Sequence, residues 1–161
     1  MLKLTILGVC TAFALSANTA IADPKPRGAK AADPNVVAKM YGGGTSIWKG
    51  CKGGIYYGAK WQAQAYCNKQ GPSVGLGKWS VDRKGTVCWN LQWYWPQDGE
   101  YGTKKQDGKE CIQHLVDKDG TMWRHWTSDG NNWWRVDPND ATEKGFKLKS
   151  KVNRVRRKIG I

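Results

Sequence analysis

The chain has 161 residues, the length of one ordinary domain, which excludes an arrangement of several large domains. Its 26 Lys and Arg against 13 Asp and Glu give a net charge of +13, which favours anionic partners. With ten Trp and only two Phe, indole rings must supply much of the aromatic packing.

Residues 1–22 have the pattern of a secretory signal peptide. Lys3 precedes an apolar run over 4–15, and the segment ends in small residues at Ala22. Cleavage near Ala22 predicts a periplasmic or secreted protein. The apolar run is too short to span a bilayer, so no transmembrane span is expected. An exported chain is also not expected to meet nucleic acid.

The next two segments are a predicted leader and a predicted helix. Residues 23–32, "DPKPRGAKAA", lack an apolar period and predict a flexible leader. Asp33 as N-cap, Pro34 in the first turn and Gly42 after the last turn predict a helix over 34–41. The apolar residues of this helix are expected to plug one end of a barrel or sheet. They are Val37, Met40 and Tyr41.

Beyond Gly44, short alternating runs separated by Asp-Gly turns predict an all-β fold. We expect a small up-and-down β-barrel or sandwich of about eight strands with one short N-terminal helix. A single β-rich domain over 33–153 and a basic tail over 154–161 follow from this pattern. The predicted strands are 45–50, 54–66 with a break near Gly58, 77–82, 86–95, 110–116, 121–127, 132–136 and 145–153.

The cysteines predict disulfides. Cys10 lies in the predicted signal peptide, which leaves Cys51, Cys67, Cys88 and Cys111. An even number in an exported chain predicts two disulfide bonds. The spacing lacks the close pairs of a zinc site, so no structural metal is expected.

The segment "CWNLQWYW" at 88–95 places three indoles on one predicted strand. Alternation puts Trp89, Trp93 and Trp95 on the same face. Trp89 and Trp93 are predicted to be core residues. Trp95 ends the strand before a predicted loop over 96–109, so it is predicted to reach a barrel mouth.

The later hairpins hold the other candidate indoles. Trp123 and His125 share one face of the strand 121–127, and His125 is predicted to have a structural role. Trp133 and Trp134 lie on opposite faces of their strand, so one of them is predicted to be exposed. The predicted ligand-binding indoles are Trp95, Trp123, Trp133 and Trp134.

The C-terminal tail, "RVRRKIGI", predicts contact with an anionic surface. Its four charges are flanked by Val155, Ile159 and Ile161, which are expected to anchor it. The alternative is an edge strand over 145–153 that lysines protect from aggregation. The basic residues predicted to bind are Arg154, Arg156, Arg157 and Lys158.

Four runs carry a family resemblance: "YGGGTSIWKG", "GGIYYGAKWQAQAYC", "GKWSVDRKGTVCWNLQW" and "DGTMWRHW". Together they resemble the exported bacterial family called domain of unknown function 995, over residues 36–136. The resemblance implies a disulfide between Cys88 and Cys111, which leaves Cys51 to pair with Cys67. It implies no catalytic residues.

The triplet Gly77-Lys78-Trp79 also resembles the G-x-W signature of lipocalins. That signature normally opens the first strand of a barrel, whereas here it follows other predicted strands. The likeness therefore implies a calycin-like barrel and no particular ligand.

The catalytic patterns of common enzyme classes are not found in the sequence. It has no nucleophile elbow, both histidines lie in one hairpin, and most carboxylates occupy turns, with Glu110 on a strand. We expect a non-enzymatic binding protein without cofactor or metal, and its expected ligands are anionic lipid, lipopolysaccharide or polysaccharide. The alternative is a small structural or inhibitor-like envelope protein whose indoles are all core and which contacts another protein.

Overall fold

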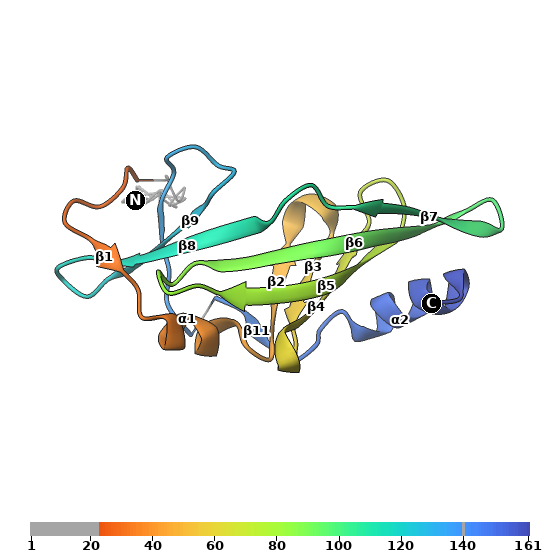
Figure 1. Cartoon of the computed structure of the whole chain (residues 1–161), viewed down its shortest axis with the longest axis horizontal. Coiled ribbons are helices and arrows are strands. Elements are labelled where there is room, and N and C mark those ends of the chain that lie inside the picture. The colour runs from red at the N-terminus through yellow and green to blue at the C-terminus, as the bar shows by residue number, and fades with distance from the viewer. Residues whose placement is uncertain (1–22, 140) are drawn as a thin grey trace, which may run out of the picture.

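The computed structural model describes residues 23–139 and 141–161, which form one curled antiparallel sheet and two helices (Figure 1). The helices are α1 (Pro34–Tyr41) and α2 (Lys149–Ile159). The predicted signal peptide, residues 1–22, lies outside the described residues. The strands are β1 (Lys30–Ala31), β2 (Gly44–Trp48), β3 (Gly53–Tyr57), β4 (Gln62–Cys67), β5 (Ser73–Val81), β6 (Val87–Gln97), β7 (Glu100–Lys105), β8 (Glu110–Val116), β9 (Met122–Trp126), β10 (Trp134–Arg135) and β11 (Glu143–Lys144).

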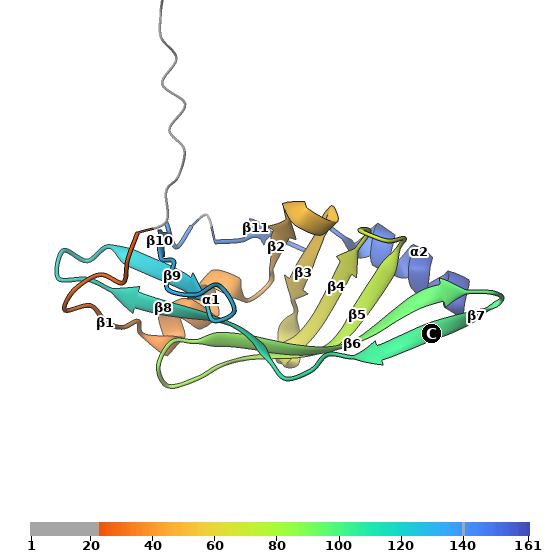
Figure 2. The ribbon, with the colours of Figure 1, turned by 90° about the horizontal axis from the view of Figure 1, so that it is seen from above.

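The sheet follows the up-and-down order expected from its hairpin turns. Its neighbours run β10-β9-β8-β6-β5-β4-β3-β2-β11, while β7 pairs with β6 and β1 pairs with β8. The sheet curls into a half-barrel, with β10 and β11 at its two edges (Figure 2). The predicted all-β, barrel-like fold is therefore confirmed.

Strand β6 organises the sheet because it pairs with three other strands. It has 11 residues and pairs with β5 from Val87 to Tyr94. On its other edge, β8 pairs with its first residues, from Val87 to Trp89, and β7 pairs with the part from Gln92 to Gln97. The two strands β7 and β8 therefore share one edge of β6.

Helix α1 packs on the inner face of the half-barrel. Asp33 caps it by accepting a hydrogen bond from the backbone N–H of Asn35 at 2.7 Å, and Pro34 occupies its first turn. The buried residues Val37, Met40 and Tyr41 join the main core, as predicted from their spacing. The principal sheet residues of this core are Ile55, Tyr57, Ala63, Ala65, Trp79, Val87, Trp89, Leu91 and Ile112.

Helix α2 packs on the opposite, outer face. It replaces the strand predicted over 145–153 and the tail predicted over 154–161, so both predictions are wrong. The apolar residues Leu148, Val152, Val155 and Ile159 repeat at helical spacing and are buried. They form a second core with Tyr66 and Val74 of the sheet, and Phe146, Tyr94 and Ile161 pack against it.

The predicted flexible leader, 23–32, is attached to the sheet. Asp23 and Trp133 exchange two backbone hydrogen bonds of 2.9 Å, and Lys30 and Ala31 form β1 beside β8. Ala32 is buried in the main core. This prediction is wrong because backbone hydrogen bonds, rather than an apolar period, hold the segment.

The predicted loop 96–109 is mostly a hairpin. Strand β6 continues to Gln97, and β7 returns beside it after a turn at Asp98 and Gly99, which have φ values of 40° and 87°. Most residues of β7 are exposed on both faces, so the strand lacks the apolar alternation from which strands are predicted.

The burial of α2 generates a stability prediction. We expect Val152→Ala to lower the free energy of unfolding by about 2 kcal/mol, because two methyl groups leave a fully buried site and create a cavity. The matched control is Ser150→Ala on the exposed side of the same helix, which we expect to change stability by less than about 0.5 kcal/mol. Urea unfolding measures both values. Equal effects of the two substitutions would contradict the packed helix.

Candidate functional site

A cavity of about 460 Å³ opens on the inner face, at the end of the sheet away from α1. Trp93 and Trp95 from β6 line it together with Cys67 and Ser73, which flank the turn between β4 and β5. Helix α1 packs beside Tyr57 and Trp79 at the other end of the inner face. No residue of α1 or α2 lines the cavity. We call this cavity the mouth. Trp95 lines this cavity near the end of β6, and Trp93, which was predicted to be a core residue, is half-buried and lines it as well.

Two glycines determine how the indoles of the mouth lie. Gly75 pairs with Trp93 across β5 and β6, and a Cβ atom at Gly75 would lie 3.2 Å from the Trp93 ring. Gly102 pairs with Trp95 across β6 and β7, and a Cβ there would overlap the Trp95 ring. Each indole therefore lies over a strand position that has no side chain. The result is a partly exposed aromatic surface, because both indoles are only half-buried.

Charged and amide side chains surround these indoles. The polar residues that line the mouth are Lys104, Lys105, Gln106, Asp107 and Glu110. Lys104 forms an exposed ion pair with Asp107 at 3.9 Å. The Nε2 group of Gln106 is buried without a hydrogen-bond partner within the described residues. The mouth therefore offers flat apolar rings beside two cations and two carboxylates.

Two of the other predicted binding indoles are buried. Trp123 and Trp133 are 6% and 2% exposed and pack with Leu115 beneath Ala29 of the N-terminal segment. The indole N–H of Trp123 donates to the Asp117 carboxylate at 2.8 Å, and this bond lowers the pKa of Asp117. Trp134 is half-buried on β10, away from the mouth. The four predicted indoles therefore do not form one site.

The basic residues predicted to bind lie on α2. Arg154, Arg157 and Lys158 are exposed, whereas Arg156 is half-buried and its Nε atom has no partner in the described part of the chain. Val155 and Ile159, predicted to anchor the tail in a surface, are instead buried against the sheet. The charges are therefore carried on a fixed helix.

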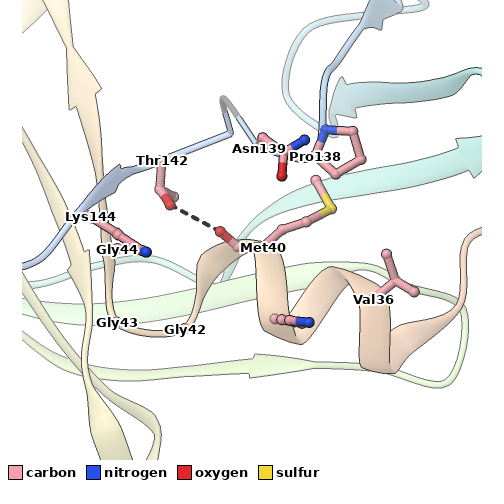
Figure 3. Close-up of a pocket in the computed structure, with 10 residues that line it drawn as sticks. Val36, Met40, Gly42, Gly43, Gly44, Pro138, Asn139, Thr142 and Lys144 are labelled. Atoms are coloured by element: carbon pink, nitrogen blue, oxygen red, sulfur yellow. Dashed lines mark hydrogen bonds between the residues drawn. The ribbon is translucent and has the colours of Figure 1, made fainter.

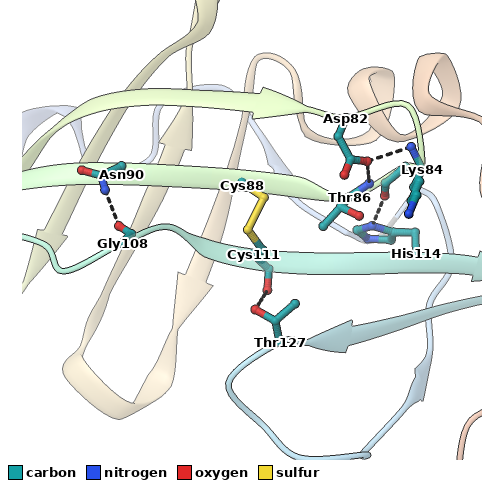
Figure 4. The surroundings of a disulfide bond; sticks show 10 residues. Asp82, Lys84, Thr86, Cys88, Asn90, Gly108, Cys111, His114 and Thr127 are labelled. Atoms are coloured by element: carbon teal, nitrogen blue, oxygen red, sulfur yellow. Dashed lines mark hydrogen bonds between the residues drawn. A yellow bond between two sulfur atoms is a disulfide. The ribbon is translucent and has the colours of Figure 1, made fainter.

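One of the two expected disulfides is present. Cys88 and Cys111 lie opposite each other on β6 and β8, with their Cα atoms 4.1 Å apart, and are bonded (Figure 4). Beside them, Asn90 on β6 donates a side-chain hydrogen bond to the carbonyl of Gly108. These contacts hold β8 against β6 where β7 ends.

Cys51 and Cys67 are free thiols in the structure, so the second expected disulfide is absent from it. The two residues are neighbours, as expected, because the backbone N–H of Asn68 donates to the carbonyl of Cys51 at 2.8 Å. Burial and the adjacent Cys67 side chain raise the pKa of the Cys51 thiol to about 12. At neutral pH the Cys51 thiol is therefore protonated and a poor nucleophile.

Both histidines make structural hydrogen bonds. His114 is fully buried, its Nδ1–H donates to the carbonyl of Gly85 at 3.0 Å (Figure 4), and its Nε2 accepts from the Tyr41 hydroxyl at 3.0 Å. Burial lowers the pKa of His114 to about 4 and raises the pKa of Tyr41 to about 12. His125 donates to the carbonyl of Asn132 at 2.9 Å and stacks on Trp133. Neither ring lines the mouth.

A different cavity, of about 530 Å³, lies between α1 and a segment that includes Pro138, Asn139, Thr142 and Lys144 (Figure 3). Gly42, Gly43 and Gly44 form one wall, and Thr142 closes another by donating to the carbonyl of Met40 at 2.9 Å. Its lining contains no aromatic residue and none of the residues predicted to bind a ligand.

Trp61 is an exposed indole that was not among those predicted to bind a ligand. This indole is 49% exposed and contacts Trp79, with ring centroids 4.6 Å apart. Lys60 and Trp61 have φ values of 53° and 61°, a conformation that bulky residues rarely adopt. The predicted break near Gly58 could have indicated the exposure of Trp61, because the strand is interrupted there by the short turn that contains Trp61.

No helix within 23–139 or 141–161 is both long and apolar enough to cross a membrane. The same residues contain no group of three or more His, Cys, Asp or Glu placed to hold a metal ion.

A family model described as "Protein of unknown function (DUF995)" matches residues 8–154. No curated protein and no solved structure matches the chain. The lipocalin likeness of the G-x-W triplet is therefore not confirmed.

The buried His114 generates a pH prediction. The unfolded chain binds a proton at this ring below pH 6.5, whereas the folded chain binds it only near pH 4. The buried, neutral His114 therefore makes its whole contribution to the free energy of unfolding above about pH 6.5. As the pH falls from 6.5 to 4, the free energy of unfolding decreases by about 3 kcal/mol.

Urea unfolding at pH 7 and pH 4.5 measures this loss. We expect His114→Gln to be less stable at pH 7 but to lose less stability on acidification. Tyr41→Phe, which removes the hydrogen-bond partner and keeps the imidazole, is the control and should retain the pH dependence. An unchanged pH dependence in His114→Gln would assign the acid sensitivity to carboxylates.

Proposed function

The chain belongs to the DUF995 family of proteins of unknown function, and we propose that it is a non-enzymatic protein that binds an acidic saccharide outside the cytoplasm. The observation that carries the proposal is the mouth, where two half-buried indoles lie beside two lysines and two carboxylates. The leader pattern of residues 1–22 and the disulfide Cys88–Cys111 support export, since disulfides persist in oxidising compartments.

Stacking on a sugar ring needs a flat, accessible aromatic surface. Trp93 and Trp95 provide it because Gly75 and Gly102 leave room for the rings to lie against the sheet. An indole also offers an N–H donor at its edge, which suits a partner with an apolar face and many hydroxyl groups. The cavity volume of about 460 Å³ lies within the range of small-molecule sites, about 300–1,000 Å³.

The net charge of the chain favours an acidic sugar over a neutral one, since the two lysines and the two carboxylates that line the mouth balance each other. Lys104 and Lys105 lie on the side of the cavity formed by β7. The high net charge of the chain, +13, adds a long-range attraction that raises the local concentration of anions. The carboxylates Asp107 and Glu110 also line the cavity, with Asp107 3.9 Å from Lys104, and they can accept hydrogen bonds from the hydroxyl groups of a sugar.

Insertion into a lipid surface is a weaker proposal for this fold. The apolar residues that were expected to enter a bilayer, Val155 and Ile159, are 4% and 8% exposed because they pack on the sheet. An attraction to anionic lipid would therefore be electrostatic and would decay with salt within a Debye length. Stacking at the mouth is expected to persist at high salt.

The test measures binding of galacturonic acid trisaccharide to the chain by calorimetry and tryptophan emission, with galactose trisaccharide as the neutral counterpart. We expect Trp95→Ala to weaken binding of the acidic sugar by about tenfold or more, equivalent to about 1.4 kcal/mol. Lys104→Gln should weaken the acidic sugar more than the neutral one. Trp134→Ala, which removes an indole outside the mouth, is the matched control and should bind normally.

Two results would overturn the proposal. Equal losses in Trp95→Ala and Trp134→Ala would show that the mouth is not the site. Cleavage of the trisaccharide that is abolished by Glu110→Gln would show an enzyme in place of a binding protein.

A further inference from the structure

We propose that a groove between α2 and the outer face of the sheet is a second binding site, which takes a phosphate monoester. The groove has a volume of about 380 Å³. One wall is α2, with Lys151, Arg154 and Lys158, and the facing wall is formed by Tyr66, Asn68 and two prolines. This site shares no residue with the mouth, and its existence does not depend on the saccharide proposal.

The three basic residues of the groove lie in a row along one side of α2. They lie at positions i, i+3 and i+7, so they project from the same side of α2 about one turn apart. The ammonium group of Lys151 lies 5.4 Å from the centroid of the Tyr66 ring, a cation–π contact that positions it at the groove. The position of α2 is itself fixed by the buried Val152 and Val155.

These cations have no acidic partner in the described residues. Helix α2 contains no Asp or Glu, and none of the residues that line the groove is acidic. Among residues 23–139 and 141–161 the single ion pair joins Lys104 and Asp107, elsewhere on the sheet. Like charges at i and i+4, such as Arg154 and Lys158, destabilise a helix by a few tenths of a kcal/mol. A bound anion would relieve this repulsion.

The number of charges selects the kind of anion. A phosphate monoester has a charge of about −1.5 to −2 at neutral pH and three acceptor oxygens, whereas a carboxylate or a sulfate ester has a single charge. Three cations around one groove match the more highly charged group. Arg154 can donate two parallel hydrogen bonds to phosphate oxygens, a geometry that guanidinium groups favour.

The groove has room for more than the phosphate. The rim prolines, Pro72 and Pro96, are rigid and apolar, and Asn68 supplies an amide donor and acceptor. The volume of about 380 Å³ is that of a site for a small molecule. The ligand class is therefore a phosphate group attached to a larger polar body, which a soluble sugar phosphate or a phospholipid headgroup would provide.

The test titrates glucose 6-phosphate into the chain at low salt and follows amide chemical shifts by NMR. We expect shifts to concentrate at Asn68 and along α2, and Arg154→Gln to weaken binding by about tenfold or more. Arg157→Gln is the matched control, because Arg157 is an exposed arginine of the same helix that does not line the groove. Its affinity should change by less than about twofold.

A second pair of variants and two further ligands sharpen the test. Lys158→Gln should weaken binding, and Lys149→Gln, outside the groove, should not. Glucose 6-sulfate should bind several-fold more weakly than the phosphate. Vesicles that contain phosphatidic acid show whether the phosphate group comes from a lipid or from a soluble molecule. Binding to these vesicles but not to glucose 6-phosphate, weakened in the same way by Arg154→Gln, would assign the site to a lipid phosphate.

Three results would overturn the inference. Equal losses in Arg154→Gln and Arg157→Gln would show a general attraction without a site. Equal affinities for the sulfate and the phosphate would reject the phosphate assignment, and failure of both glucose 6-phosphate and the vesicles to bind would reject the groove altogether. Trp95→Ala should leave phosphate binding unchanged, so that failure of the mouth and failure of the groove are distinguishable.

Discussion

The pairing of β6 with three neighbours is the constraint on which the rest of the structure depends. Its first half is held between β5 and β8 and contributes Trp89 and Leu91 to the main core. Its second half lies between β5 and β7, and there the same face carries Trp93 and Trp95 at the mouth. A disulfide from Cys88 to Cys111 fixes β8 on the first half of this edge. One continuous strand thus links the closed and the open parts of the half-barrel.

Both faces of the sheet carry apolar residues, so each needs a cover. The inner face is covered by α1 at one end, and the outer face is covered by α2, which buries Tyr66 and Val74. The outer face beside β9 is covered by the N-terminal segment over Leu115, Trp123 and Trp133. Most indoles are buried in these cores or pack against them, which is expected when a chain has ten Trp and two Phe. The half-buried indoles of the mouth lie where none of these three covers reaches.

The parts of the fold that were predictable are those with strong local signals. Asp33, Pro34 and Gly42 mark the ends of α1, and Asp-Gly turns mark the β6–β7, β8–β9 and β9–β10 hairpins. The C-terminal segment was predicted as a strand because Lys147, Lys149 and Lys151 alternate with less polar residues, as in a strand. The helical spacing of its apolar residues is visible only over a longer window, and these residues are Leu148, Val152, Val155 and Ile159. The position of Trp95 was predictable from the chain. The neighbouring lysines and glycines of the mouth were not, because β5, β6 and β7 meet only through pairings that are set by the register of the sheet.

The attachment of the N-terminal segment gives the molecule a defined direction. The backbone of Asp23 is bonded to Trp133, and β1 and the C-terminal helix lie at opposite ends of the long axis (Figure 1). A tag, a support or a fused domain joined ahead of Asp23 therefore emerges beside Trp133, far from α2. A chain immobilised in this way presents its helix end to the surrounding solution and keeps it clear of the support.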